Sequence, residues 1–516
     1  MKKTRIVPLV LRGDMFRDDI DANHFFAAVF TIFLSIGALY AFKALLPSEK
    51  LFAEAARNGQ DANIAVDSAM LIALAEHAAA DVADIVAVSL SVEPETGGAA
   101  PPPQPSAAEA VEVIAAYEGE YGDEGAEDAV NGMVRFFQKL FALEDTKKGS
   151  VRIAYFGDSM IEGDLIVYDL RRSYQRKFGG QGVGFVPLSS IASHLGMSTQ
   201  YEYSPKWVTY SALKKPPVPF GINGFVSVAG ADASVWTRYR GGLLPLVNPT
   251  LYYGRSENAD AVMIVTADGV VSDSTPLKPV GILNKRPLAS SPRELRVQFD
   301  GAQSIPFYGV NFSGVNGVNI DDFALRGSSG LPLAGLSVGL MNAFQREFGY
   351  DLLVLQFGAN VLWPGVAKYN WYESGMTKAV NHLKKCFPGA DVLVISQADK
   401  AAKYGTEMKT DTALAALLKA QERYARNTGA AFINLFQLMG GEGKMLEWAN
   451  AKPSLAAADY THFSPAGAKK IAGLIYQRLD KDYEDFKRLN NLTVGAAAEG
   501  GESESESGSG GGNESE

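Results

Sequence analysis

One serine, one histidine and one aspartate stand where they could form a triad for nucleophilic catalysis. Ser159 comes just after the apolar run VRIAYF (151–156), and Asp459 precedes His462 by three residues. A serine hydroxyl is a weak nucleophile until a base takes its proton, and that base needs a third group to orient it. An aspartate three residues before a histidine can accept the Nδ1–H of the ring while Nε2 faces a serine. This combination indicates acyl-transfer chemistry.

The choice of base is narrow, because the chain has only 5 histidines. His462 comes just before Ser464-Pro465, a pair typical of a helix N-cap followed by the first helical residue. A helix that begins there would fix the direction of the His462 side chain. The D-x-x-H spacing is a weak signal by itself, since Asp21 and His24 repeat it. The histidines without a comparable setting are His24, His77, His194 and His382.

The segments around this triad alternate between short apolar runs and helical patterns. Apolar runs predict buried strands at 151–156, 351–357, 391–396 and 430–436. Amphipathic patterns predict helices at 164–178, 371–386, 411–428 and 465–479. Such alternation predicts an α/β fold with a doubly wound parallel sheet. Ser159 follows the first strand, and open parallel sheets bind their ligands at the carboxyl ends of the strands.

The pattern changes between about 200 and 318, where short alternating runs are rich in Tyr, Val, Gly, Pro and Asn. The clearest runs are 259–267, 294–299 and 306–312. They predict an all-β, sandwich-like domain at 201–318, inserted into the α/β domain. The α/β domain would then consist of residues 126–200 and 319–485.

The short motifs, taken in order, resemble those of the SGNH (GDSL-type) hydrolases. The four blocks of that family match Gly157-Asp158-Ser159, the glycine of Arg326-Gly327-Ser328-Ser329-Gly330, Gly358-Ala359-Asn360 and Asp459-x-x-His462. The resemblance implies a serine esterase in which Ser159 is the nucleophile, His462 the general base and Asp459 its orienter. It also implies an oxyanion hole that is formed by the backbone N–H groups of Ser159 and Gly330 and the side-chain amide of Asn360.

Two details of this match are open. The third block of the family usually ends in Asn-Asp, whereas Val361 follows Asn360 here. Activity is still expected, although this departure weakens it slightly. The second block contains two glycines, so Gly327 is an alternative to Gly330 as the oxyanion glycine.

The place of the inserted β domain adds to the resemblance. Peptidoglycan O-acetylesterases of Gram-negative bacteria are SGNH enzymes with a β-sandwich, similar to a carbohydrate-binding module, at this point of the chain. Four aromatic residues of the insert either offer stacking faces to sugars or pack in its core, the commoner fate; they are Trp236, Tyr239, Tyr252 and Tyr253. Trp363 and Trp371 follow the third block and are better placed to line a cleft, with packing as the alternative.

A membrane anchor is expected near the N-terminus. The segment 25–42 carries no charge, and the apolar stretch 25–46 reaches the length of one bilayer-spanning helix. Five basic residues precede it, so the positive-inside rule places residues 1–24 in the cytoplasm and the rest outside. No convincing cleavage site follows, which favours an uncleaved signal anchor over a signal peptide. A buried core helix is the alternative.

The remaining segments and the composition narrow the interpretation. Residues 47–125 are interpreted as an Ala-rich helical stalk with a Pro-rich break, and 486–516 as a disordered acidic Gly/Ser tail. A formal net charge of −10 argues against nucleic-acid binding. Cys386 is the single cysteine, which excludes an internal disulfide and Cys-rich metal sites. No cofactor and no metal are expected.

These features together predict a single-pass protein of a bacterial inner membrane, with its globular part in the periplasm. The resemblance to peptidoglycan O-acetylesterases implies removal of O-acetyl groups from an envelope polysaccharide such as peptidoglycan. One alternative is an O-acetyltransferase that uses the same triad and a membrane-bound acyltransferase as partner, because acceptor binding and water exclusion decide between transfer and hydrolysis. Another alternative is a non-catalytic, glycan-binding envelope protein.

Overall fold

The structure is a computed structural model that describes residues 132–494 except for 215–217, 232–233, 242–245 and 364. The expected cytoplasmic segment, membrane anchor and stalk up to residue 125 therefore lie outside the described residues, as does the tail from 495 onward. Within the described part, no helix has both the length and the apolar character that crossing a membrane requires.

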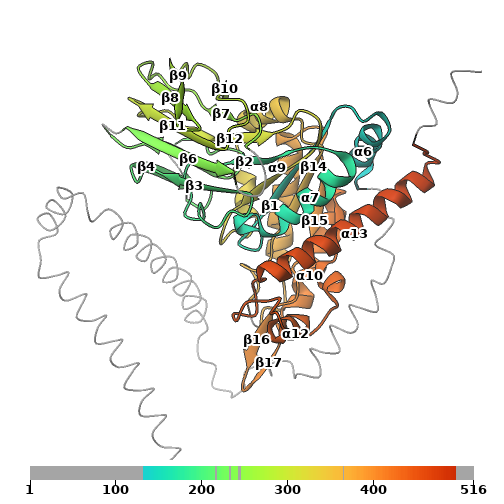
Figure 1. Ribbon diagram of the computed structural model, residues 1–516. Coiled ribbons are helices and arrows are strands. Elements are labelled where there is room, and N and C mark those ends of the chain that lie inside the picture. The colour runs from blue at the N-terminus through green and yellow to red at the C-terminus, as the bar shows by residue number, and fades with distance from the viewer. Residues whose placement is uncertain (1–131, 215–217, 232–233, 242–245, 364, 495–516) are drawn as a thin grey trace, which may run out of the picture. The chain divides into compact units, whose positions relative to one another are not determined.

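A five-stranded parallel sheet forms the α/β part (Figure 1). Every neighbouring pair of its strands runs parallel. Strand β1 is buried at seven of its eight residues, which is typical of a parallel strand covered on both faces. The strands, in their order across the sheet, are β13 (Gly317–Ala324), β1 (Ser150–Gly157), β14 (Leu352–Gln356), β15 (Asp391–Ile395) and β18 (Ala431–Ile433).

Helices cover both faces of this sheet, because successive residues of each strand point to opposite sides. Ile153 and Tyr155 of β1 belong to one apolar cluster, whereas Ala154 and Phe156 belong to another. The first cluster contains residues of α6 (Val134–Thr146), α7 (Leu165–Phe178) and α13 (Pro465–Leu489). The second contains residues of α8 (Val338–Phe348), α9 (Asn370–Cys386) and α10 (Leu414–Thr428). The predicted parallel sheet covered by helices on both faces is therefore confirmed.

Residues 182–313 form two antiparallel sheets. Phe299 and Phe307 come from different sheets, and the centroids of their rings lie 4.5 Å apart. One apolar core therefore lies between the two sheets. The first sheet contains β10 (Asn284–Pro287), β7 (Thr250–Tyr253), β12 (Phe307–Ser313), β5 (Phe225–Ala229) and β4 (Trp207–Ser211), with β2 (Gly182–Val186) paired to β12. The second contains β3 (Thr199–Tyr203), β6 (Val235–Gly241), β11 (Glu294–Asp300), β8 (Val262–Ala267) and β9 (Val270–Pro276).

The ends of these antiparallel sheets differ from the expected range 201–318. Strand β2 begins at Gly182, well before the expected start of the insert at 201. The left-handed backbone at Gly182 and the close approach of the Phe312 carbonyl oxygen, 2.1 Å from where a Cβ would stand, require glycine there. At the other end, Gly317 already belongs to β13 of the parallel sheet.

Smaller elements complete the chain. The run 430–436, expected as one strand, divides into β18 and the short helix α11 (Leu435–Met439), because the Asn434 side chain accepts the Gln437 N–H and caps the helix. The other short elements are η1 (Glu162–Asp164), η2 (Leu331–Gly335), α12 (Lys444–Asn450), β16 (Ala401–Tyr404) and β17 (Glu407–Thr410). Strands β16 and β17 form an antiparallel hairpin of their own.

Candidate active site

Ser159, His462 and Asp459 meet at the carboxyl end of β1. Ser159 Oγ lies 2.8 Å from His462 Nε2, although 303 positions separate the two residues in sequence. His462 Nδ1 lies 2.6 Å from Asp459 Oδ2. The fold thus brings together the serine, histidine and aspartate that the sequence singles out, at distances suited to proton transfer.

Local hydrogen bonds hold the aspartate of this trio. Asp459 Oδ1 accepts the backbone N–H groups of Thr461 and His462, each at 3.0 Å. Burial raises the pKa of Asp459, but the hydrogen bonds from His462 and Thr461 outweigh it and leave the pKa below its usual value. Asp459 is therefore ionised at neutral pH and favours the Nδ1–H tautomer of the imidazole.

The helix expected after His462 is present. Ser464 caps α13 by accepting the N–H of Gly467 at 3.2 Å, and Pro465 is its first residue. The backbone N–H of Ala457 donates to the carbonyl of His462 at 2.8 Å, which closes the loop that carries Asp459. The His462 side chain is thus oriented by the cap and by this loop.

Gly330 and Asn360 lie in neighbouring loops. Gly330 has a φ of +87°, and a Cβ there would stand 2.9 Å from the ring of Phe357, which leads into the Asn360 loop. Its N–H donates to Ser328 Oγ at 3.1 Å. Gly327 also has a positive φ, but it is exposed, and a Cβ there would stand no closer than 3.9 Å to another side chain, that of Leu213. The geometry favours Gly330 over Gly327 as the glycine beside Asn360.

The side-chain amide of Asn360 donates twice. Its Nδ2 lies 3.0 Å from Asp158 Oδ2 and 2.9 Å from the carbonyl oxygen of Ser328. Asp158 is 1% exposed, and Val361, the departure from the family pattern, is 2% exposed in the apolar core. An aspartate at 361 would be buried among apolar side chains here, so the valine fits its surroundings.

Sequence reasoning missed the contribution of Asp158 and Lys400 to this arrangement. The Lys400 ammonium donates to the carbonyl of Leu362 at 3.1 Å, and the N–H of Ala401 donates to the carbonyl of Tyr460 at 3.1 Å. The β16–β17 hairpin that begins at Ala401 thereby connects the Asn360 loop to the His462 loop. No spacing in the sequence signals these contacts, although the place of Asp158 directly before the serine could have drawn attention to it.

The aromatic candidates fall into two groups. Tyr239, Tyr252 and Tyr253 are buried, at 0%, 3% and 5% exposure, so they pack in the interior and offer no face to a sugar. Trp236 is half-buried, with the Arg296 guanidinium 4.6 Å from its ring centroid. Trp363 and Trp371 are 55% and 47% exposed. The Tyr372 hydroxyl, next to Trp371, donates to the carbonyl of Ser329 at 2.9 Å and so ties this segment to the Gly330 loop.

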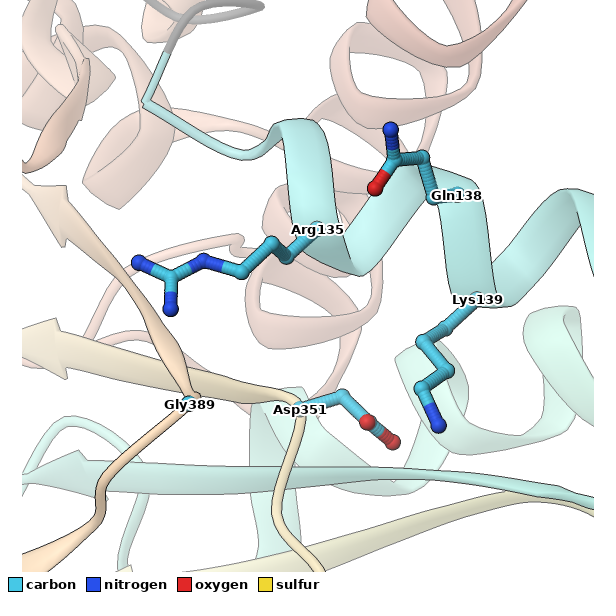
Figure 2. A pocket seen from close by; sticks show the side chains of 5 residues that line it. All are labelled: Arg135, Gln138, Lys139, Asp351 and Gly389. Carbon is cyan, nitrogen blue, oxygen red and sulfur yellow. The ribbon is translucent and has the colours of Figure 1, made fainter.

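A cavity of about 220 Å³ lies at the other end of the parallel sheet (Figure 2). Asp351 and Gly389 contribute to it just before β14 and β15 begin, and α6 contributes Arg135, Gln138 and Lys139. Figure 2 shows Lys139 extending toward Asp351 and Arg135 toward Gly389. This cavity adjoins the amino ends of the strands, whereas Ser159 follows the carboxyl end of β1. The cavity is therefore separate from the serine site. Among the described residues, no group of three or more His, Cys, Asp or Glu side chains is placed to hold a metal.

Comparisons with known proteins bear on the family and the fold of this chain. Residues 286–470 match the GDSL-like Lipase/Acylhydrolase family. A solved structure of a peptidoglycan O-acetylesterase matches 68% of this chain and 96% of its own chain, with 18% sequence identity and a TM-score of 0.58. No curated protein matches the chain in sequence.

A weaker structural match is a carbohydrate esterase family 2 enzyme from Corynascus thermopiles, with 12% identity over 55% of this chain and 99% of its own and a TM-score of 0.25. We draw no argument from a score that low. The match to the acylhydrolase family and the fold of the peptidoglycan O-acetylesterase carry the assignment. The chain therefore contains an ester-hydrolysing domain of the GDSL (SGNH) type and shares the fold of a peptidoglycan O-acetylesterase.

Proposed function

We propose that this protein is a membrane-anchored serine esterase that removes O-acetyl groups from an envelope polysaccharide such as peptidoglycan. The observation that carries the proposal is the continuous line of hydrogen bonds from Ser159 through His462 to Asp459, with distances of 2.8 and 2.6 Å. This arrangement activates a serine hydroxyl for attack on a carbonyl carbon.

The reaction proceeds in two halves. His462 Nε2 takes the Ser159 proton as Oγ attacks the ester carbonyl, and the resulting imidazolium is stabilised by the ionised Asp459. The tetrahedral intermediate collapses when His462 gives the proton to the departing sugar oxygen, which leaves an acetyl group on Ser159. A water molecule, deprotonated by His462, then attacks this acetyl ester and releases acetate and free Ser159.

Negative charge develops on the acyl oxygen in both halves. The backbone N–H groups of Ser159 and Gly330 and the amide of Asn360 are the donors that would stabilise it. Neutral, prearranged donors of this kind each contribute about 10²–10³-fold to the rate. Asn suits this role because its NH₂ donates without being ionised.

The glycan would contact Trp363 and Trp371. Both indole rings are about half exposed on the segment that follows Asn360, and aromatic faces bind the apolar faces of sugar rings. The structural likeness to a peptidoglycan O-acetylesterase supports an acetylated sugar polymer as the substrate. The buried tyrosines of the antiparallel sheets argue against those side chains as a second sugar-stacking surface.

Hydrolysis is favoured over acetyl transfer by the openness of the triad. The side chains of His462 and Asp459 are 35% and 50% exposed, so water can reach the acetyl-enzyme. A transferase must exclude water from this intermediate in favour of a glycan hydroxyl. The periplasmic location rests on the apolar segment 25–46 and the basic residues before it.

The test is hydrolysis of p-nitrophenyl acetate by the full chain in detergent, beside Ser159→Ala and His462→Ala. Turnover that is lost in both variants supports the proposed acyl-enzyme chemistry. Release of acetate from O-acetylated peptidoglycan, compared with an O-acetylated polysaccharide of another class, then tests the substrate. A folded wild-type protein that hydrolyses neither p-nitrophenyl acetate nor an O-acetylated polysaccharide would contradict the proposal.

A further inference from the structure

Asp158, directly before the nucleophile, is a buried carboxylate that the mechanism above does not use. Its Oδ1 accepts the N–H of Met160 at 3.0 Å, and its Oδ2 accepts the side-chain amide of Asn360 at 3.0 Å. The titratable groups that act on it or on which it acts are His462 and Tyr372. Asp158 therefore links the turn that carries the nucleophile to the loop that carries the amide.

The amide of Asn360 cannot stabilise an acyl oxygen as it stands. Its NH₂ has two hydrogens, and both are donated, one to Asp158 and one to the carbonyl of Ser328. A substrate oxygen must therefore replace one of these acceptors. Hydrogen bonds to a carboxylate are roughly twice as strong as bonds between neutral groups, so the bond to the Ser328 carbonyl is the one to be given up.

We propose that Asp158 is a positioning residue that holds one N–H of Asn360, so that the other N–H turns from the Ser328 carbonyl to the acyl oxygen in the transition state. The inference rests on the proposed esterase function. With Asp158 as a fixed acceptor, the Asn360 amide can rotate only about its hydrogen bond to Asp158. The second N–H of the amide therefore stays directed toward the acyl oxygen. Without that acceptor, the amide is free to keep its bond to Ser328 or to turn away.

Protonation of Asp158 at low pH should lower activity as the substitution Asp158→Asn does, because both remove the negative charge that holds Asn360. Burial raises its pKa to about 6, against the opposing effects of the Met160 N–H, the charge of His462 and the Asn360 amide. A protonated carboxyl has one unprotonated oxygen for two donors and no charge to strengthen the bond. Activity would thus fall on the acid side as the Asp158 anion is lost.

The experiment compares Asp158→Asn with Asp399→Asn in the full chain, on p-nitrophenyl acetate at pH 8. Asp399 is a matched control, because it is also buried and its pKa is also raised by burial. It also accepts backbone N–H groups, from Met445 and Lys400, and a side-chain donor, Thr410. We expect kcat to fall about 10- to 100-fold in Asp158→Asn with KM changed less than about threefold, a fraction of the loss of an oxyanion donor. Asp399→Asn should keep kcat within about threefold.

The pH profile gives a readout that a merely structural role would not move. In the wild type, the acid limb of kcat should contain an extra decrease near pH 6, of the same size as the loss in Asp158→Asn at pH 8. This extra decrease should be missing from the acid limb of the variant. An acid limb of identical shape in both proteins, or equal kcat values at pH 8, would overturn the proposal.

A spectroscopic measurement separates this inference from the proposed function. In protein labelled with ¹⁵N-asparagine, the Asn360 side-chain signal, assigned by its absence in Asn360→Ala, should shift between pH 5 and 7 and should not shift in Asp158→Asn. This result is expected whichever ester the protein hydrolyses, and even if the wild type hydrolyses none of those tested. A signal that is insensitive to pH in the wild type would overturn the link between Asp158 and Asn360.

Discussion

Aromatic side chains are used differently in the two β regions of the molecule. In the antiparallel sheets they form the core: Trp207 is 7% exposed and its ring lies 5.4 Å from that of the fully buried Phe307. Beside the parallel sheet, after the Asn360 loop, Trp363 and Trp371 leave about half of their surface to solvent. Exposed aromatic surface that the proposed glycan could contact is therefore found after the Asn360 loop and not among these core residues.

Strand β11 of the antiparallel sheets and the carboxyl ends of the parallel strands place their polar residues differently. Strand β11 alternates buried and partly exposed residues, so its polar side chains turn toward solvent. At the carboxyl ends of the parallel strands, Asp158 and Ser328 are buried and hydrogen-bonded to loops. Fixed polar groups that face one another are what preorganised catalysis needs. The candidate catalytic groups lie at the parallel sheet.

The largest expected effect tests where the chemistry lies. Ser159→Ala should lower kcat/KM on p-nitrophenyl acetate by about 10⁴-fold or more, because no other group can form the acyl-enzyme. Trp236→Ala, on the antiparallel sheet, is the control and should keep the wild-type value. Residual turnover by Ser159→Ala within about tenfold of the wild type would place the reactive group elsewhere.

The next effect tests the orienting aspartate. Asp459→Asn should lower kcat by about 10³-fold, less than the roughly 10⁴-fold seen for a fully buried triad aspartate, because Asp459 is half exposed and solvent also stabilises the imidazolium. Steady-state kinetics at pH 8 measure this. Thr461→Val keeps the backbone N–H that Asp459 accepts and should be nearly silent; a loss below tenfold in Asp459→Asn would show that His462 is oriented without it.

The sequence predicts much of the parallel region because its strands are continuous apolar runs and its helices are amphipathic. It does not predict β13, whose Asp321 and Asp322 look unlike a buried strand. The structure explains Asp321 by its pairing with the equally buried Arg152, at 2.7 Å between Nε and Oδ2. Such pairing depends on tertiary contacts that no local pattern contains.

The candidate site shows the same limit. Ser159, Asp459 and His462 can be found from residue type and spacing, because a triad has a known chemical requirement. The bond between Asp158 and Asn360 joins residues 202 positions apart and depends on how two loops meet. Burial of Tyr239 and exposure of Trp371 likewise depend on packing, since both are aromatic residues in unremarkable local sequence.

A smaller effect tests the aromatic comparison directly. Trp371→Ala should raise KM about fivefold for soluble O-acetylated glycan fragments and leave p-nitrophenyl acetate kinetics within about twofold, since the loss of one stacking partner is worth about 1 kcal/mol. Acetate release at varied glycan concentration measures KM. Trp236→Ala, which removes a half-buried indole from the antiparallel sheet, should leave both substrates unaffected. A rise in KM with Trp236→Ala alone would reverse the comparison and locate glycan binding on the antiparallel sheets.

The smallest effect concerns stability and follows from the buried polar groups beside Ser159. Because the folded-state pKa of Asp158, about 6, lies above its ordinary value of 3.8, the folded protein holds a proton that the unfolded chain has released between these values. The contribution of Asp158 to the free energy of unfolding therefore decreases as pH rises toward 6, by up to about 3 kcal/mol for this difference in pKa. Asp158→Asn does not titrate, so its Tm relative to the wild type should increase by a few degrees between pH 4.5 and 7.5.

The same measurement on a residue of the antiparallel sheets shows why this behaviour belongs to the catalytic region. Asp273 on β9 accepts a hydrogen bond from the Arg286 guanidinium at 2.8 Å, and this bond lowers the pKa of Asp273. The Tm of Asp273→Asn relative to the wild type should therefore decrease as pH rises through the acid range, opposite to the change expected for Asp158→Asn. The Asp273 side chain is exposed enough that the change should be within about one degree. A carboxylate that weakens the fold at neutral pH is retained when its charge has another use, which for Asp158 is to hold Asn360. If both variants responded to pH with the same sign, this contrast between the catalytic and the supporting region would fail.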